Sequence, residues 1–120
     1  MRRSSHLQIG KRGEEFACKA IKKMGYRILE RNYKCKIGEI DVIAMDGDIL
    51  VFIEVKTRRH SIAYAKESID KKKMKKLVAV ASFYMKQKGY QNKKARFDVI
   101  AIYLKDKDIQ FELIKNAFSL

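Results

Sequence analysis

The chain has 120 residues and a formal net charge of +14, with 47% hydrophobic and 35% charged residues. This length and composition predict a single domain over residues 1–120 with one ordinary hydrophobic core. The basic excess excludes a predominantly acidic surface and makes a polyanion the expected partner.

The sequence carries no membrane or export signal that we recognise. No apolar run approaches the roughly 18–20 residues of a membrane-spanning helix, and the first residues have an arginine pair without the apolar segment of a signal peptide. Cys18 and Cys35 have neither CxxC nor Cys/His metal spacing, so we expect reduced thiols. We therefore expect a cytoplasmic protein that does not enter the membrane.

A helix and three strands are predicted in the first half of the chain. Apolar residues recur at helical spacing over residues 11–24, and Gly25 ends this helix. Strands are predicted over residues 26–34, 39–45 and 49–56. The last of these is apolar on both faces, which is typical of a central strand. Asp46-Gly47 predicts a tight turn between the second and third strands.

The second half of the chain begins with a polar loop over residues 57–64. The elements predicted after it are a helix over 67–88, a strand over 95–104, a turn at 105–108 and an edge strand over 109–113. The order is therefore αβββαββ. Because the hairpin is antiparallel and the second helix permits a parallel crossover, we predict an α/β fold with a mixed sheet flanked by helices.

Two acidic residues of the hairpin are the candidate site. Glu54 and Lys56 are two apart on one strand, so their side chains leave the same face. If Asp46-Gly47 forms a two-residue turn, Asp41 is a diagonal neighbour of Glu54. A four-residue loop places Asp41 directly opposite Glu54, and a three-residue loop places the two on opposite faces. The register of the hairpin therefore decides whether the site exists.

Keeping two neighbouring carboxylates charged and unpaired among apolar residues costs free energy, and a bound divalent cation would remove that cost by pairing with both charges. Mg²⁺ prefers oxygen ligands, and Lys56 is placed to contact a scissile phosphate or to orient water. The alternative is that Asp41 ends a strand and that Glu54 and Lys56 form an exposed pair. The apolar run before Glu54 favours the site, because it indicates that Glu54 and Lys56 lie at the end of a buried strand rather than on an exposed one.

Other charged residues are secondary candidates. Glu14 lies on the inward side of the first helix and is the acid that could face the site, although a first-turn acid also suits the helix dipole. Arg96 and Asp98 share a face of their strand, and we interpret them as a partly buried pair near the site.

The second helix and the segment before it are candidates for phosphate contacts. Residues 66–96 contain 11 basic and 2 acidic side chains. Such dense like charges repel one another unless an anion neutralises them, and a phosphate backbone is the simplest such anion. The alternative is an ordinary solvated helix face. The candidate residues are Arg58, Arg59, Lys71, Lys72, Lys73, Lys75 and Lys76.

Several of these motifs together resemble the bacterial YraN-like family. That family belongs with the PD-(D/E)XK nucleases of restriction-endonuclease-like fold and is similar to archaeal Holliday-junction resolvases. The matching motifs are Gly13-Glu14, Gly38-Glu39-Ile40-Asp41-Val42-Ile43-Ala44, Val51-Phe52-Ile53-Glu54-Val55-Lys56-Thr57-Arg58, Lys73 and Arg96-Phe97-Asp98-Val99. The resemblance covers nearly the whole chain and implies a restriction-endonuclease-like mixed sheet.

The resemblance also implies roles for individual residues. Asp41 and Glu54 would bind Mg²⁺ or Mn²⁺, with the carbonyl of Val55 as a third oxygen. Lys56 would be the catalytic lysine, and Glu14 the helix-borne acid of resolvase-like members. The resolvases act as dimers, so a homodimer is an open alternative by analogy.

The leading hypothesis is a Mg²⁺- or Mn²⁺-dependent nuclease that hydrolyses DNA, with branched or otherwise structured DNA among its candidate substrates. The alternative is a non-catalytic nucleic-acid-binding module that retains the nuclease fold, whose binding depends on salt and on backbone contacts. A basic domain bound to an acidic protein or an anionic membrane is disfavoured, because no amphipathic helix carries exposed Trp, Phe or Leu opposite its lysines.

Overall fold

The computed structural model describes residues 2–59, 70–105 and 107–118. In chain order the elements are α1 (Arg2–Lys23), β1 (Arg27–Lys34), β2 (Glu39–Asp46), β3 (Ile49–Arg58), α3 (Lys71–Lys88), β4 (Ala95–Lys105) and β5 (Asp108–Phe118). The predicted order αβββαββ is confirmed. No described helix is long and apolar enough to span a membrane.

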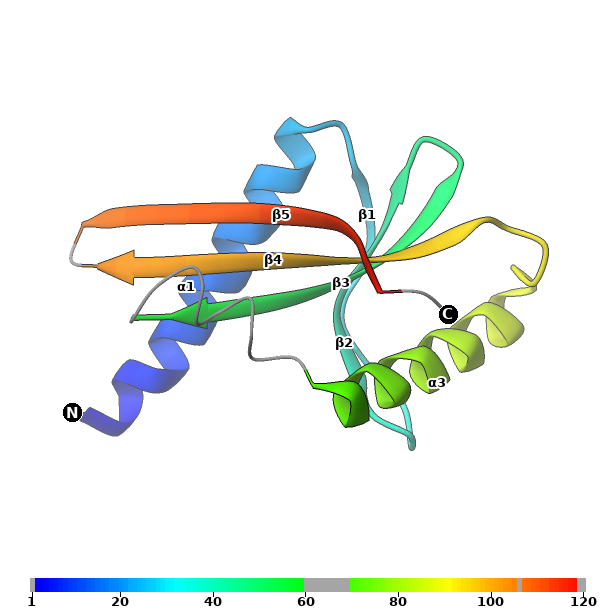
Figure 1. The fold of residues 1–120 in the computed structure, drawn as a ribbon, viewed down its shortest axis with the longest axis horizontal. Helices are drawn as coiled ribbons and strands as arrows, with labels where there is room; N and C mark the ends of the chain where they lie inside the picture. Colours follow the sequence, from blue (N-terminus) through cyan, green and yellow to red (C-terminus); the bar gives the residue numbers. More distant parts are fainter. Residues whose placement is uncertain (1, 60–69, 106, 119–120) are drawn as a thin grey trace.

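The strands form one mixed sheet in the order β1-β2-β3-β4-β5. The first three strands are an antiparallel meander. The chain then passes through α3 and returns as β4, which is parallel to β3, and β5 pairs antiparallel with β4 at the edge. The two helices cover opposite faces of this sheet (Figure 1). This arrangement confirms the predicted mixed sheet flanked by helices and is compatible with the restriction-endonuclease-like fold that the family resemblance implies.

Alternate residues of β3 face different helices, which makes it the central strand. Val51 and Ile53 pack in the cluster under α1, whereas Phe52 packs against α3 through Tyr84, with ring centroids 6.0 Å apart. Both faces are therefore buried until Glu54, the next residue on the α3 face. The apolar residues of β3 thus place the Glu54 carboxylate at the end of the interface between the sheet and α3.

Several element boundaries differ from the predicted ones. The first helix begins at Arg2, because residues 2–10 are helical without the apolar periodicity on which the prediction relied. The second helix begins at Lys71, since extended Asp70 caps it and accepts a hydrogen bond from the Lys73 N–H at 2.8 Å; residues 67–69 lie outside the described residues. The loop predicted over 57–64 starts later, because β3 continues to Arg58, and its residues 60–64 are not described. The last strand runs on to Phe118.

The hairpin turn lies one residue later than predicted. Asp46 pairs with Ile49, so Gly47 and Asp48 form the turn. Gly47 adopts φ 62, the left-handed conformation that a two-residue hairpin needs at its first central position and that glycine adopts without strain. The pairing extends to Val42 opposite Ile53, which brings the next residue, Asp41, level with Glu54. Asp41 therefore lies opposite Glu54, as predicted for a four-residue loop, although the turn itself has two residues.

A buried polar network joins the hairpin to β4 on the α1 face. Arg96 donates hydrogen bonds to Asp46 at 2.7 Å and to Asp98 at 3.0 Å. Asp98 is fully buried and also accepts bonds from the Tyr26 hydroxyl and the Asn116 N–H, each at 3.0 Å. Burial and the Asp98 charge raise the pKa of Tyr26 to about 12. The predicted pair of Arg96 and Asp98 therefore exists, but on the face of the sheet opposite to Glu54.

Candidate active site

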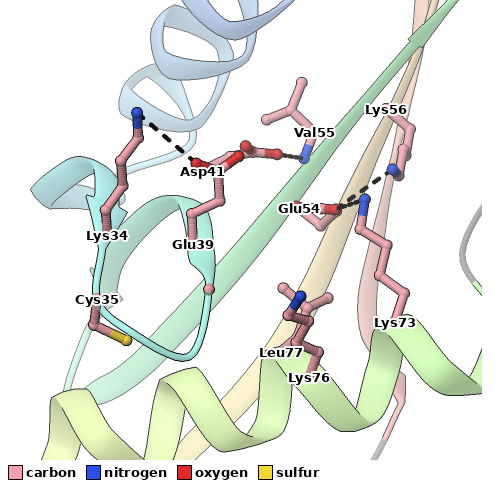
Figure 2. Close-up of a pocket in the computed structure, with 11 residues that line it drawn as sticks. Lys34, Cys35, Glu39, Asp41, Glu54, Val55, Lys56, Lys73, Lys76 and Leu77 are labelled. Atoms are coloured by element: carbon pink, nitrogen blue, oxygen red, sulfur yellow. Dashed lines mark hydrogen bonds and ion pairs between the residues drawn. The ribbon is translucent and has the colours of Figure 1, made fainter.

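A cleft of about 540 Å³ lies between α3 and the segment that joins β1 to β2. Figure 2 shows carboxylates at its centre and lysines on both sides of them. The lining residues are Lys34, Cys35, Gly38, Glu39, Asp41, Glu54, Val55, Lys56, Lys73, Lys76 and Leu77. The hairpin supplies the floor, and α3 supplies one wall.

Asp41 and Glu54 both line this cleft, and their carboxyl groups are close enough that each affects the pKa of the other. The Asp41 side chain also accepts a hydrogen bond from the Val55 N–H at 2.8 Å, which ties it to the end of β3. Burial, together with the bond to Glu54, raises the pKa of Asp41 to about 8. The register of the hairpin therefore brings together the two residues whose separation the sequence left open.

Two lysines neutralise Glu54. Its carboxylate lies 2.7 Å from the Lys73 Nζ and 3.5 Å from the Lys56 Nζ. Burial alone would raise the pKa of Glu54, but the bonds to Asp41 and Lys73 outweigh burial and lower it. Burial and the neighbouring Lys73 lower the pKa of Lys56. The side chains of Glu54 and Lys56 are only 8% and 11% exposed, so these charges interact in an environment from which water is largely excluded.

Lys73 contacts Glu54, although its position in a run of lysines predicts a contact with a phosphate backbone. It reaches Glu54 because it lies one helical turn before Leu77, which is buried against the sheet. That four-residue spacing to a core leucine is the signal that distinguishes it. Lys71, Lys72 and Lys75 are exposed on other sides of the helix.

The remaining candidates lie around the cluster. Glu14 is half-buried on α1 and does not line the cleft, but its charge helps to raise the pKa of Asp41. Its neighbour Gly13 is buried where a Cβ would overlap the Thr57 hydroxyl, so α1 approaches β3 closely there. Arg58 is half-buried and donates a hydrogen bond to the Thr57 carbonyl at 2.8 Å.

The cleft also contains residues that sequence reasoning missed. Lys34 and Glu39 form an exposed ion pair at 4.0 Å, and Cys35 lies between them in sequence. The adjoining Gly38 lies against α3, where a Cβ would come within 3.3 Å of the Lys76 side chain. Lys34 and Cys35 belong to no motif that the sequence offers, and Gly38 and Glu39 lie in a matching motif without a predicted role. Their place in the cleft depends on how β1 and β2 pair.

Fold and site together describe an α/β domain that is compatible with the restriction-endonuclease-like class and holds two carboxyl groups, Asp41 and Glu54, in one cleft. A family model described as uncharacterised protein family UPF0102 matches residues 13–102. The chain belongs to this family, which is the YraN family indicated by its motifs.

Individual relatives support the assignment over nearly the full chain. A UPF0102 protein of Syntrophus aciditrophicus is 42% identical over 120 residues, covering 99% of this chain and 94% of its own. One of Caldicellulosiruptor saccharolyticus is 44% identical and covers 92% and 97%. One of Dictyoglomus thermophilum is 43% identical and covers 95% and 99%.

Proposed function

We propose that this protein is a metal-dependent nuclease that hydrolyses phosphodiester bonds of DNA, with branched or otherwise structured DNA among its candidate substrates. The observation that carries the proposal is the pair of half-buried Asp41 and buried Glu54, which adjoins Lys56 and Lys73 in a cleft with lysines on its walls. A polyanion is drawn to such a cleft, and the carboxylate pair supplies the chemistry that a purely basic surface lacks.

The donor atoms in the cleft fit a hard divalent cation. Among the described residues no group of three or more His, Cys, Asp and Glu side chains gathers that could hold a metal ion, so a cation in this cleft would need ligands beyond its two carboxylates. The carboxylates of Asp41 and Glu54 and the carbonyl of Val55 would hold Mg²⁺ or Mn²⁺, with water and phosphate oxygens as further ligands. When bound, such a cation activates water and neutralises charge on the reacting phosphate.

The protein's own groups would bind and orient the nucleic acid. Lys56 lies at the end of β3, 3.5 Å from Glu54, where its ammonium group can pair with a phosphate oxygen or orient a water molecule for attack. Lys34 and Lys76 stand on opposite sides of the cleft (Figure 2) and can hold the backbone on either side of the scissile bond. Fixed positive charge in a site with little water stabilises the negative charge that develops during hydrolysis.

The proposal is tested by incubating the protein with single-stranded, duplex and four-way DNA in the presence of Mg²⁺ or Mn²⁺. We expect at least one substrate to be cut, and we expect a chelator to stop the reaction. If wild type and Asp41→Ala give the same background on every substrate with both metals, the hydrolytic function is refuted. DNA binding without any cleavage would support the non-catalytic module instead.

A second prediction concerns Lys73, whose ammonium group lies 2.7 Å from Glu54. A divalent cation at Glu54 competes with this ammonium group. Lys73→Met is therefore expected to tighten Mn²⁺ binding about fivefold at low ionic strength. Calorimetric titration measures the dissociation constant. Lys76→Met is the matched control, because Lys76 lines the same cleft one turn further along α3. Equal or weaker Mn²⁺ binding by Lys73→Met than by Lys76→Met would contradict the competition.

A further inference from the structure

The outer surface of α3 carries a continuous stripe of exposed residues that shares Lys76 with the cleft and extends beyond it along the helix. The helix contains seven lysines and no acidic residue. Residues spaced three and four apart share one side of a helix. The outer α3 stripe consists of Lys72, Lys76, Ala79, Phe83 and Lys86, all of which are exposed.

Phe83 is the unusual member of this stripe. Its side chain is 42% exposed, while the neighbouring Tyr84 is buried against the sheet and completes the core there. The ring of Phe83 therefore presents an apolar surface between lysines at both ends of the stripe. The small side chain of Ala79 leaves the ring accessible from the direction of Lys76.

The stripe is continuous with the cleft through Lys76, which belongs to both. Phe83 lies seven residues further along the helix, a rise of about 10 Å. About three nucleotides of a stacked strand, at roughly 3.4 Å each, cover that distance. A strand whose phosphate lies at Asp41 and Glu54 can thus pass Lys76 and reach the ring.

We infer that the outer α3 stripe is a binding surface for an unpaired nucleic-acid strand, with Phe83 stacking on a base beside the cleavage site. Lysines track the phosphates, and an aromatic face stacks on a base of any sequence, but only when that base is not paired within a duplex. The occupant is thus a single strand or the unpaired arm of a structured substrate. The inference rests on the proposed nuclease function and narrows its substrate class.

The test measures binding in a chelator, so that no cutting occurs, by fluorescence anisotropy with a single-stranded oligonucleotide and a hairpin duplex of equal charge. Phe83→Ala is expected to weaken single-strand binding about tenfold and duplex binding less than about twofold. Phe83→Tyr keeps the ring and is expected to restore single-strand affinity. Phe111→Ala is the matched control, because Phe111 is 40% exposed but lies at the sheet edge on β5.

Unchanged single-strand affinity in Phe83→Ala would overturn the inference, and so would an equal loss on the duplex. Sedimentation with vesicles of phosphatidylcholine and phosphatidylglycerol provides the other arm. If Phe83→Ala abolished vesicle binding and left single-strand binding intact, the stripe would be a membrane surface and the inference would be wrong. Ring-dependent strand binding in a protein that never cuts DNA would refute only the proposed hydrolysis.

Discussion

Glu54→Gln is expected to lower the rate of the proposed metal-dependent DNA cleavage about a thousandfold, because it removes a charged ligand of the proposed metal ion from the centre of the cleft. The substitution keeps the size of the side chain, which is 8% exposed. In the wild type the Lys73 ammonium group lies 2.7 Å from the charged Glu54 carboxylate. In the variant it lies beside a neutral amide. DNA affinity in a chelator should not fall, since phosphate contacts come from the lysines and the variant has one negative charge fewer.

The matched control is Glu39→Gln, which removes the same charge from the same cleft. Glu39 is exposed and lies 4.0 Å from the exposed Lys34, so its contribution is screened by water and salt. We expect the cleavage rate of this variant to stay within about threefold of wild type. A similar loss in both variants would mean that bulk charge, rather than the Asp41–Glu54 pair, governs the reaction.

Asp98→Ala is expected to lower the free energy of unfolding by about 3–5 kcal/mol, which is the cost of removing one partner of a buried ion pair. Asp98 is fully buried and accepts hydrogen bonds from Arg96, Tyr26 and Asn116. Without it, the Arg96 guanidinium, which is 14% exposed, keeps only Asp46 as an acidic partner in this network. Urea denaturation of both proteins at neutral pH measures the difference.

Asp108→Ala provides the control for this stability prediction, because Asp108 is an exposed carboxylate at the start of β5. Its free energy of unfolding should stay within about 0.5 kcal/mol of wild type. If Asp98→Ala were as stable as Asp108→Ala, the buried network would contribute nothing to the fold. Residual folded Asp98→Ala should still bind Mn²⁺ like wild type, since the network lies on the α1 face and Glu54 lies on the other.

Most of the fold could be predicted because local sequence patterns indicate its helices, strands and turns. The apolar run before Glu54 identified the central strand, and Gly89 marked the helix end, where it takes the left-handed φ of 72. The ends of helices and strands were predicted wrongly where no local sequence pattern marks them. The first nine residues of α1 lack an apolar stripe, and the extension of β3 to Arg58 depends on its pairing with Tyr103 of β4, which lies far away in sequence.

The candidate site was predictable only up to the register of the hairpin. A shift of one residue in pairing sends a side chain to the other face of a sheet, so the placement of Gly47 in the turn decides whether Asp41 meets Glu54. The position of Lys73 could likewise not be predicted from the sequence of its helix alone. Its identity suggested a phosphate contact, and only the docking of α3 through Leu77 shows that it reaches Glu54.

The sequence by itself determined the order of the elements, the excess of positive charge and the identity of the few acidic residues that emerge from an apolar strand. These follow from local periodicity and composition, which do not depend on distant contacts. The tertiary structure alone decided the pairing of Asp41 with Glu54, the contact of Lys73 with Glu54 and the placement of Asp98 on the other face. Each of these depends on the register of a hairpin or the packing of a helix, because residues far apart in sequence must meet before their charges interact.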